Sequence, residues 1–300
     1  MKSALYSYAN KLNGKYRLGF IYALSRSFVA LGTLITLVCN SSETLFYFES
    51  LPEDRYPHLI LSNFSLFSLV DPFIGQIISI GVLIIVISGF LPRLTGILHF
   101  WITLSFYLAC PIIDGGDQLS VILSFLFIPL TLFDNRINHW TKYHFDENAY
   151  LKNIFVSSTM IIVQIQMAFL YFHATIAKLR VEEWLDGTAL FYWFGHPLYG
   201  MPEYLYDCTY FLFSNKYIIP IITWSILILE YVLSVSFLFK DRNKQRVFKV
   251  ALLFHIGIVI IHGLISFFFA MLGGLVLYLL LNSKLDKYYF ENFKLIKNGE

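Results

Sequence analysis

Long apolar runs recur along the whole chain, and they constrain its fold more than any other feature. A helix that crosses the hydrocarbon core of a bilayer needs about 20 predominantly apolar residues. Within lipid, such a segment satisfies its own backbone hydrogen bonds when it is helical. The sequence therefore predicts an all-α, polytopic membrane bundle of about eight helices. The apolar runs lie near 18–39, 71–91, 94–112, 118–133, 154–178, 217–239, 248–264 and 266–281.

The predicted number of spans depends on two less regular places. Segments 118–133 and 266–281 are short for a full crossing. The last two segments form one apolar run, which we divide at 263–266, so seven spans is an alternative. Only 14% of the residues are charged, against about 25% in soluble domains. No long polar segment interrupts the chain, so we expect one membrane domain over residues 1–300.

The distribution of basic residues predicts an orientation. Cytoplasmic segments of membrane proteins are enriched in Lys and Arg. With a cytoplasmic N-terminus, the inner segments hold Lys2, Lys11, Lys15, Arg17, Arg93, Arg136, Lys142, Lys152, Lys240, Arg242, Lys244, Arg246, Lys249, Lys284, Lys287, Lys294 and Lys297. The outer segments collect acids instead, among them Glu43, Glu49, Glu53, Asp54 and Asp71. We therefore expect a multi-pass protein of the cell membrane with both termini in the cytoplasm. Because the charges separate by membrane side instead of forming a basic patch, nucleic-acid binding has no support.

The fifth apolar segment carries a polar stripe that ends in a lysine. Gln164, Tyr171, Thr175 and Lys178 follow one another at helical spacing. Such a stripe faces protein or a wet cavity, because lipid would leave its polar groups unpaired. A partly desolvated lysine there is a candidate catalytic base, with Tyr171 and Thr175 beside it. The alternative is that Lys178 extends to the outer surface and pairs with Glu182.

Other ionisable side chains lie inside the apolar segments. Arg26 and Glu230 would each be costly alone at the bilayer centre, so we expect them to pair, as a structural clamp or in a substrate or proton path. His255 and His262 share one helix face, either as a proton relay or as hydrogen-bonding groups between helices. His173 lies off the polar stripe, and we expect it to pack against a neighbouring helix.

Two outer segments are candidate parts of a site. In 114–118, the two glycines suggest a tight turn with positive φ. Asp117 is the expected N-cap of the fourth segment, and Asp114 and Asp117 could equally line a site with Lys178. The aromatic segment 179–216 contains Trp184, Asp186 and Gly187. It suits an interfacial belt or a lid over an apolar or peptide substrate.

The three cysteines fall on the predicted outer side. Cys39, Cys110 and Cys208 allow one disulfide in an oxidising compartment, with one thiol left over. The alternative is that Cys39 and Cys110 act as small apolar residues at the ends of their segments. The histidines are scattered and lack the spacing of a metal site.

Residues 166–178, followed by Glu183-Trp184-Leu185-Asp186-Gly187, resemble the signature of the HTTM domain. This domain is the membrane core shared by vitamin K-dependent gamma-carboxylase and many bacterial proteins. Arg26 ahead of Gly32, Asp117 with Leu119, and Phe254-His255 extend the resemblance over about residues 18–281. It implies that Lys178 acts as a base on a reduced quinone such as menaquinone. Thr175 and Ala177 stand where the pattern has Gly and Lys, so the resemblance does not carry over glutamate carboxylation.

Three further stretches, 22–27, 92–101 and 114–118, resemble the sporulation-delaying protein B family more closely. That resemblance implies a role in converting a secreted SdpC-like precursor into an antimicrobial peptide, together with a small SdpA-like partner protein. Three classes of function stay open. The chain could be a maturation factor that modifies the peptide with a lysine base, an exporter of the peptide, or a non-catalytic scaffold for the partner.

Overall fold

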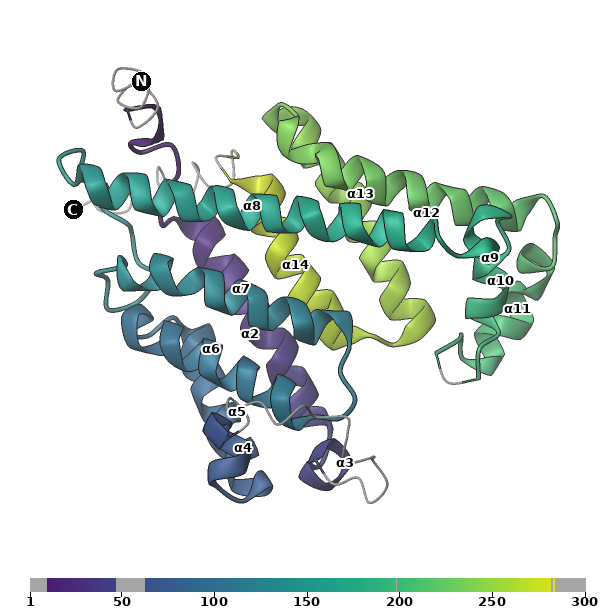
Figure 1. Cartoon of the computed structure of the whole chain (residues 1–300), viewed down its shortest axis with the longest axis horizontal. Coiled ribbons are helices and arrows are strands. Elements are labelled where there is room, and N and C mark those ends of the chain that lie inside the picture. Colours follow the sequence, from purple (N-terminus) through teal and green to yellow (C-terminus); the bar gives the residue numbers. More distant parts are fainter. Residues whose placement is uncertain (1–9, 47–62, 198, 282, 284–300) are drawn as a thin grey trace, which may run out of the picture. The chain divides into compact units, whose positions relative to one another are not determined.

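The computed structural model describes residues 10–46, 63–197, 199–281 and 283. The described segments contain helices and an isolated antiparallel bridge between Phe90 and Asn138 (Figure 1). The predicted all-α class is therefore confirmed for the described residues. Several residues used to predict the orientation lie outside them, namely Lys2, Glu49, Glu53, Asp54, Lys284, Lys287, Lys294 and Lys297.

Eight of the described helices coincide with the eight apolar segments. They are α2 (Phe20–Cys39), α5 (Pro72–Ser88), α6 (Pro92–Ala109), α7 (Gly115–Leu132), α8 (Tyr150–Lys178), α12 (Ile218–Val235), α13 (Asp241–His262) and α14 (Ile265–Leu280). Five long helical stretches, at 20–39, 115–132, 150–178, 218–238 and 241–262, are apolar enough to cross a membrane, and α5 and α14 are shorter apolar helices. The chain is therefore a helical membrane protein. The number of crossings and the position of the termini stay predictions.

Local sequence signals set several helix boundaries. Asp71 caps α5 by accepting hydrogen bonds from the backbone N–H groups of Phe73 (2.9 Å) and Ile74 (3.4 Å), and Pro72 occupies the first turn. Gly263 ends α13 with φ of 69°, a left-handed conformation that residues other than glycine rarely adopt. The last apolar run is therefore two helices, divided where the sequence analysis divided it.

The chain forms two compact units, unit 1 (Met1–Val163 with Ile265–Glu300) and unit 2 (Gln164–Leu264). In unit 1, α14 runs along α2 (Figure 1). A Cβ atom on Gly32 would lie 2.9 Å from the Ser266 carbonyl oxygen, and one on Gly273 would lie 2.6 Å from Val29 Cγ2. The Ser25 hydroxyl donates to the Gly273 carbonyl at 2.6 Å. Small residues therefore let these two helices approach closely, as is common in membrane bundles.

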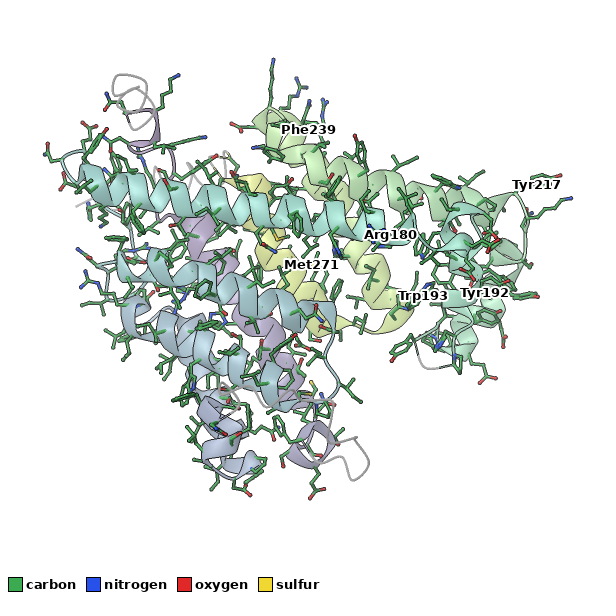
Figure 2. The ribbon with its side chains drawn as sticks, in the orientation of Figure 1. Arg180, Tyr192, Trp193, Tyr217, Phe239 and Met271 are labelled. Atoms are coloured by element: carbon green, nitrogen blue, oxygen red, sulfur yellow. The ribbon has the colours of Figure 1, made fainter. Side chains whose placement is uncertain are left out.

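Unit 2 contains a small helical cluster where the sequence analysis placed one long outer segment. Its helices are α9 (Glu182–Leu185), α10 (Ala189–Phe194) and α11 (Glu203–Phe213). Their apolar faces meet α12 in what we call the Trp184 core, which consists of Trp184, Ala189, Leu190, Phe194, Phe213, Ile219 and Leu227. The aromatic residues of 179–216 therefore divide into a buried set and an exposed set. Among the exposed residues of this segment, Tyr192 and Trp193 are marked in Figure 2.

The described chain also contains shorter helices. They are α3 (Ser42–Phe46), α4 (Leu66–Leu69) and the 3-10 turn η3 (Ser236–Leu238), which follows α12.

Candidate functional site

An ion pair inside unit 2 joins the end of α8 to the middle of α12. Lys178 Nζ lies 2.8 Å from each carboxylate oxygen of Glu230. The side chain of Glu230 is 8% exposed and that of Lys178 is 25% exposed. Each charge would be expensive alone at this depth, so the pairing allows both to stay in apolar helices. Lys178 is thus held as an ammonium that donates to both oxygens.

An indole ring lies close to this ion pair. Lys178 Nζ is 5.4 Å from the ring centroid of Trp184, within cation–π range. Trp184 is itself buried in the Trp184 core. The motif that joins Lys178 to Trp184 in the sequence therefore brings an ammonium, a carboxylate and an aromatic ring together.

The predicted polar stripe of α8 is buried. Gln164, Tyr171 and Thr175 are each at most 6% exposed. The Thr175 hydroxyl donates to the Tyr171 backbone carbonyl at 2.9 Å, which is a common arrangement for Thr within a helix. The Tyr171 ring meets the His255 ring edge-on at 6.4 Å. The burial is confirmed, and catalytic roles for Tyr171 and Thr175 stay predictions.

The alternative partner that the sequence offered for Lys178 is wrong. Lys178 pairs with Glu230 and not with Glu182. Within unit 1, Arg26 Nη1 lies 2.9 Å from His139 Nδ1 and its Nη2 donates to Thr95 Oγ1 at 2.7 Å. The expected pair of Arg26 with Glu230 would join the two units and stays a prediction. The error arises because a sequence places ionisable residues on helices without showing which faces meet.

His139 is a buried partner that the sequence analysis missed. It lies in the segment after α7, where its backbone N–H donates to the Gly89 carbonyl at 2.9 Å. Burial is the largest cause that lowers its pKa, to about 2, and the charges of Arg26 and Arg136 act in the same direction. Neutral His139 can therefore accept from Arg26 through Nδ1. The sequence shows a polar run directly after an apolar segment, and nothing in that run distinguishes His139 from its neighbours.

The proposed relay of His255 and His262 stays a prediction, and the Nδ1 atom of each ring contacts a backbone carbonyl. His255 Nδ1 lies 2.8 Å from the Ala251 carbonyl in its own helix, and His262 Nδ1 contacts the Tyr199 backbone carbonyl. Each carbonyl is an acceptor, so each Nδ1 carries the hydrogen. His173 is exposed, with its ring centroid 6.1 Å from that of Phe169, so the expected packing of His173 against another helix is wrong.

The acidic turn before α7 is a reciprocal cap. Asp114 is the N-cap, and its carboxylate accepts from the Asp117 backbone N–H at 2.9 Å. Asp117 accepts in return from the Asp114 N–H at 3.1 Å. The expected cap therefore falls on Asp114 and not on Asp117. Both acids belong to unit 1 and Lys178 belongs to unit 2, so a shared site stays a prediction.

The glycines of this turn have a different role from the expected one. The described glycines with positive φ are at 14, 89, 187 and 263, so neither glycine of the turn has that conformation. A Cβ atom on Gly116 would instead lie 2.8 Å from Phe267 Cα. Gly116 thus permits the close packing of α7 against α14.

The residues after Trp184 shape the turn into α10. Asp186 Oδ1 accepts from the Thr188 backbone N–H at 2.8 Å and from its hydroxyl at 2.6 Å, and these bonds lower the pKa of Asp186. Gly187 has φ of 85°, and a Cβ atom there would lie 2.6 Å from Pro220 Cβ. Both residues therefore have a structural explanation in the packing of this turn on α12.

The thiols are unpaired in the structure. Cys39, Cys110 and Cys208 are all free, and the alternative of one disulfide stays a prediction. Cys110 is buried, as expected for a small apolar residue, whereas Cys39 is exposed.

The sequence of this chain is similar to the sequences of two known proteins. The chain is 34% identical over 261 residues to sporulation-delaying protein SdpB of Bacillus subtilis (strain 168), covering 86% of this chain and 80% of that protein. It is 31% identical over 264 residues to the protein YitO of the same strain, covering 86% and 84%. No family model and no solved structure matches. Because the first similarity spans most of both chains, this chain belongs to the SdpB family.

Proposed function

We propose that this protein takes part in the production of a secreted antimicrobial peptide of the sporulation-delaying type. The family membership supports the general role. The observation that supports a specific site is the buried ion pair between Lys178 and Glu230, with Trp184 beside it. Membrane proteins rarely keep ionisable groups in apolar helices without a functional reason.

The proposal includes a location for this site. In the HTTM-type topology, eight helices cross the cell membrane and both termini lie in the cytoplasm. The end of α8 then faces the outer side, where a secreted precursor is accessible. An SdpA-like protein and an SdpC-like precursor are the proposed partners.

The ion pair offers a simple acid–base chemistry. Transfer of one proton from the Lys178 ammonium to the Glu230 carboxylate leaves a neutral amine beside a neutral carboxylic acid. The amine is then a general base and the acid a general acid at one place. We propose that this pair serves a modification of the peptide.

The described geometry does not fit a quinone at Lys178. The ammonium donates to both oxygens of Glu230 and lies beside the Trp184 ring. A pocket of this unit, at Phe194, Met201 and His262, is lined by neither residue of the pair. We therefore derive no step through a quinone.

The test compares secreted peptide from cells with and without this protein by mass spectrometry. The key variant is the double replacement Lys178→Met/Glu230→Met, because replacing a buried ion pair by apolar residues of similar size often leaves the fold stable. Lys216→Met, at an exposed lysine of the same unit, is the matched control. We expect the double variant to lose the mature peptide and the control to keep it.

The mass of the peptide separates the functional classes. An altered covalent structure in the absence of the protein supports modification. A peptide of unchanged mass retained in the cells would indicate export instead. A double variant that produces normal peptide, while deletion of the protein does not, would indicate a scaffold. Normal peptide after deletion would refute the role in production.

A further inference from the structure

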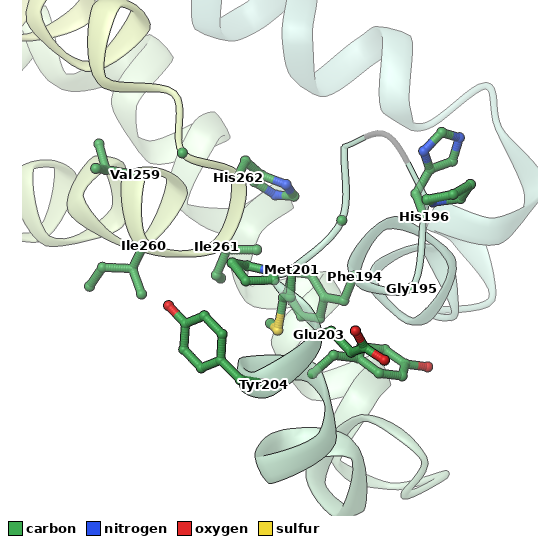
Figure 3. A pocket seen from close by; sticks show the side chains of 15 residues that line it. Phe194, Gly195, His196, Met201, Glu203, Tyr204, Val259, Ile260, Ile261 and His262 are labelled. Carbon is green, nitrogen blue, oxygen red and sulfur yellow. The ribbon is translucent and has the colours of Figure 1, made fainter.

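Unit 2 contains a pocket of about 770 Å³ between the segment that joins α10 to α11 and the C-terminal end of α13 (Figure 3). Its volume lies within the usual range for ligand sites, roughly 300–1,000 Å³. Part of the wall is aromatic and aliphatic, with Phe194, Met201, Tyr204, Ile260 and Ile261 among its residues. Such a wall suits an apolar side chain.

Two polar groups of the pocket are available to a ligand. Glu203 begins α11, is exposed, and forms no ion pair or hydrogen bond with other described residues. His262 donates through Nδ1 to the Tyr199 carbonyl, so its Nε2 is an acceptor when the ring is neutral. The pocket therefore presents one carboxylate and one imidazole acceptor beside an apolar wall.

The net charge of the segment that contributes Glu203 to the pocket favours a cation. Segment 179–216 contains five acidic and two basic residues, namely Glu182, Glu183, Asp186, Glu203 and Asp207 against Arg180 and Lys216. Opposite potentials steer and orient a ligand. The rings of Tyr204 and Tyr206 line the same pocket, and aromatic faces attract ammonium and guanidinium groups.

The pocket also borders the proposed site. Phe194 belongs to the Trp184 core, and Ile261 packs against that core. Both residues line the pocket as well. Trp184 in turn lies over Lys178. The pocket and the ion pair are thus both in contact with residues of the Trp184 core.

We propose that this pocket anchors a basic, aromatic segment of the precursor peptide. An aromatic side chain enters between Tyr204 and Ile260, and a neighbouring Lys or Arg binds Glu203. The inference rests on the proposed function, since it names how the peptide is held close to Lys178. It predicts that recognition depends on positive charge as well as on apolar contact.

The binding test uses the full chain in phosphatidylcholine nanodiscs, with p-benzoylphenylalanine in place of Tyr204. The probes are two synthetic peptides, acetyl-Lys-Phe-Phe-Lys-amide and its Glu-Phe-Phe-Glu counterpart. We expect photo-crosslinking to the basic peptide and little to the acidic one. The same photoreactive group in place of Tyr192, an exposed residue outside the pocket, is expected to give little crosslinking to either.

Matched variants test the contribution of each contact. Glu203→Gln is expected to lower crosslinking to the basic peptide about two- to fivefold, the range of an exposed charge pair. Asp207→Asn, one turn further along α11 and outside the pocket, should leave it unchanged. Equal crosslinking of both peptides, equal crosslinking from both positions, or adducts with lipid alone would each overturn the proposal.

Peptide production in cells separates this inference from the proposed function. Ile260→Trp fills the pocket, and Ile256→Trp places the same bulk one turn earlier on α13, outside it. We expect Ile260→Trp to reduce the peptide and Ile256→Trp to keep it. If Ile260→Trp and Glu203→Gln both give normal production while deletion of the protein abolishes it, the proposal for the pocket is refuted and the proposed function stands. Normal production after deletion would refute the proposed function.

Discussion

Both carboxylate oxygens of Glu230 accept from the amine of Lys178, each at 2.8 Å, across 52 residues of sequence. This contact joins α8 to α12 inside unit 2 and leaves each charge with a partner. This contact either holds the two helices together or takes part in a reaction. Variants that keep the ion pair but move its amine to the other helix can separate these two roles.

A charge exchange provides that separation. Lys178→Met or Glu230→Gln alone leaves one buried charge without its partner and is expected to cost roughly 2–4 kcal/mol of stability. The exchange Lys178→Glu/Glu230→Lys restores an ion pair and should recover most of that loss in thermal unfolding of the purified protein. It moves the amine from α8 to α12, so peptide production should remain absent. Production in the exchanged variant would show that the pair is only a clamp.

Stability should fall in mild acid because of His139. Its pKa in the folded protein is lowered to about 2, whereas an unfolded chain has a His pKa of about 6.5. The unfolded chain therefore binds more protons below about pH 6.5, and the folded state loses stability as the pH falls through that value. Between pH 7 and pH 5.5 the expected loss is about 1 kcal/mol.

The measurement is thermal unfolding of the purified protein at both pH values. His139→Gln keeps an acceptor for Arg26 and removes the titrating ring, so its unfolding should depend less on pH. His144→Gln, at an exposed histidine of the same segment, should behave like the wild type. The same pH dependence in all three proteins would contradict this assignment.

A third prediction concerns the turn at Gly187. Alanine there would adopt an unfavourable positive φ and place its Cβ 2.6 Å from Pro220 Cβ. Together these effects should cost about 2–4 kcal/mol. Gly257→Ala is the contrasting variant, since a Cβ atom on that helical glycine meets nothing within 4 Å and should stabilise α13 by up to about 1 kcal/mol. Thermal unfolding that shows no difference between the two variants would count against the described packing.

The helices could be predicted because their signals are local. Apolar length marks the segments, and residues such as Asp71, Pro72 and Gly263 mark their ends. The partners could not be predicted in the same way. Arg26 and His139 are 113 residues apart, and their contact depends on how the segment after α7 folds back. Sequence periodicity gives the face of a helix but not the element that covers it.

The aromatic segment 179–216 shows the same limit. Its composition fits an interfacial belt, and several of its rings are indeed exposed. The sequence does not show that Trp184 and Phe194 instead form a core on α12. That division depends on short helices whose apolar faces become visible only when they pack. The pocket and the surroundings of Lys178 both result from this packing.

Variants at Asp114, in the acidic turn before α7, can distinguish a helix-capping role of its carboxylate from a catalytic role. The Asp114 side chain accepts from the Asp117 N–H, and an amide oxygen can do the same. Asp114→Asn should therefore keep its stability within about 0.5 kcal/mol of wild type, whereas Asp114→Ala should lose about 1 kcal/mol, measured by thermal unfolding. Peptide production in the stable Asn variant then decides the role of the charge. If production is normal, Asp114 serves the helix alone; if it is lost at unchanged stability, the carboxylate belongs to the site with Lys178.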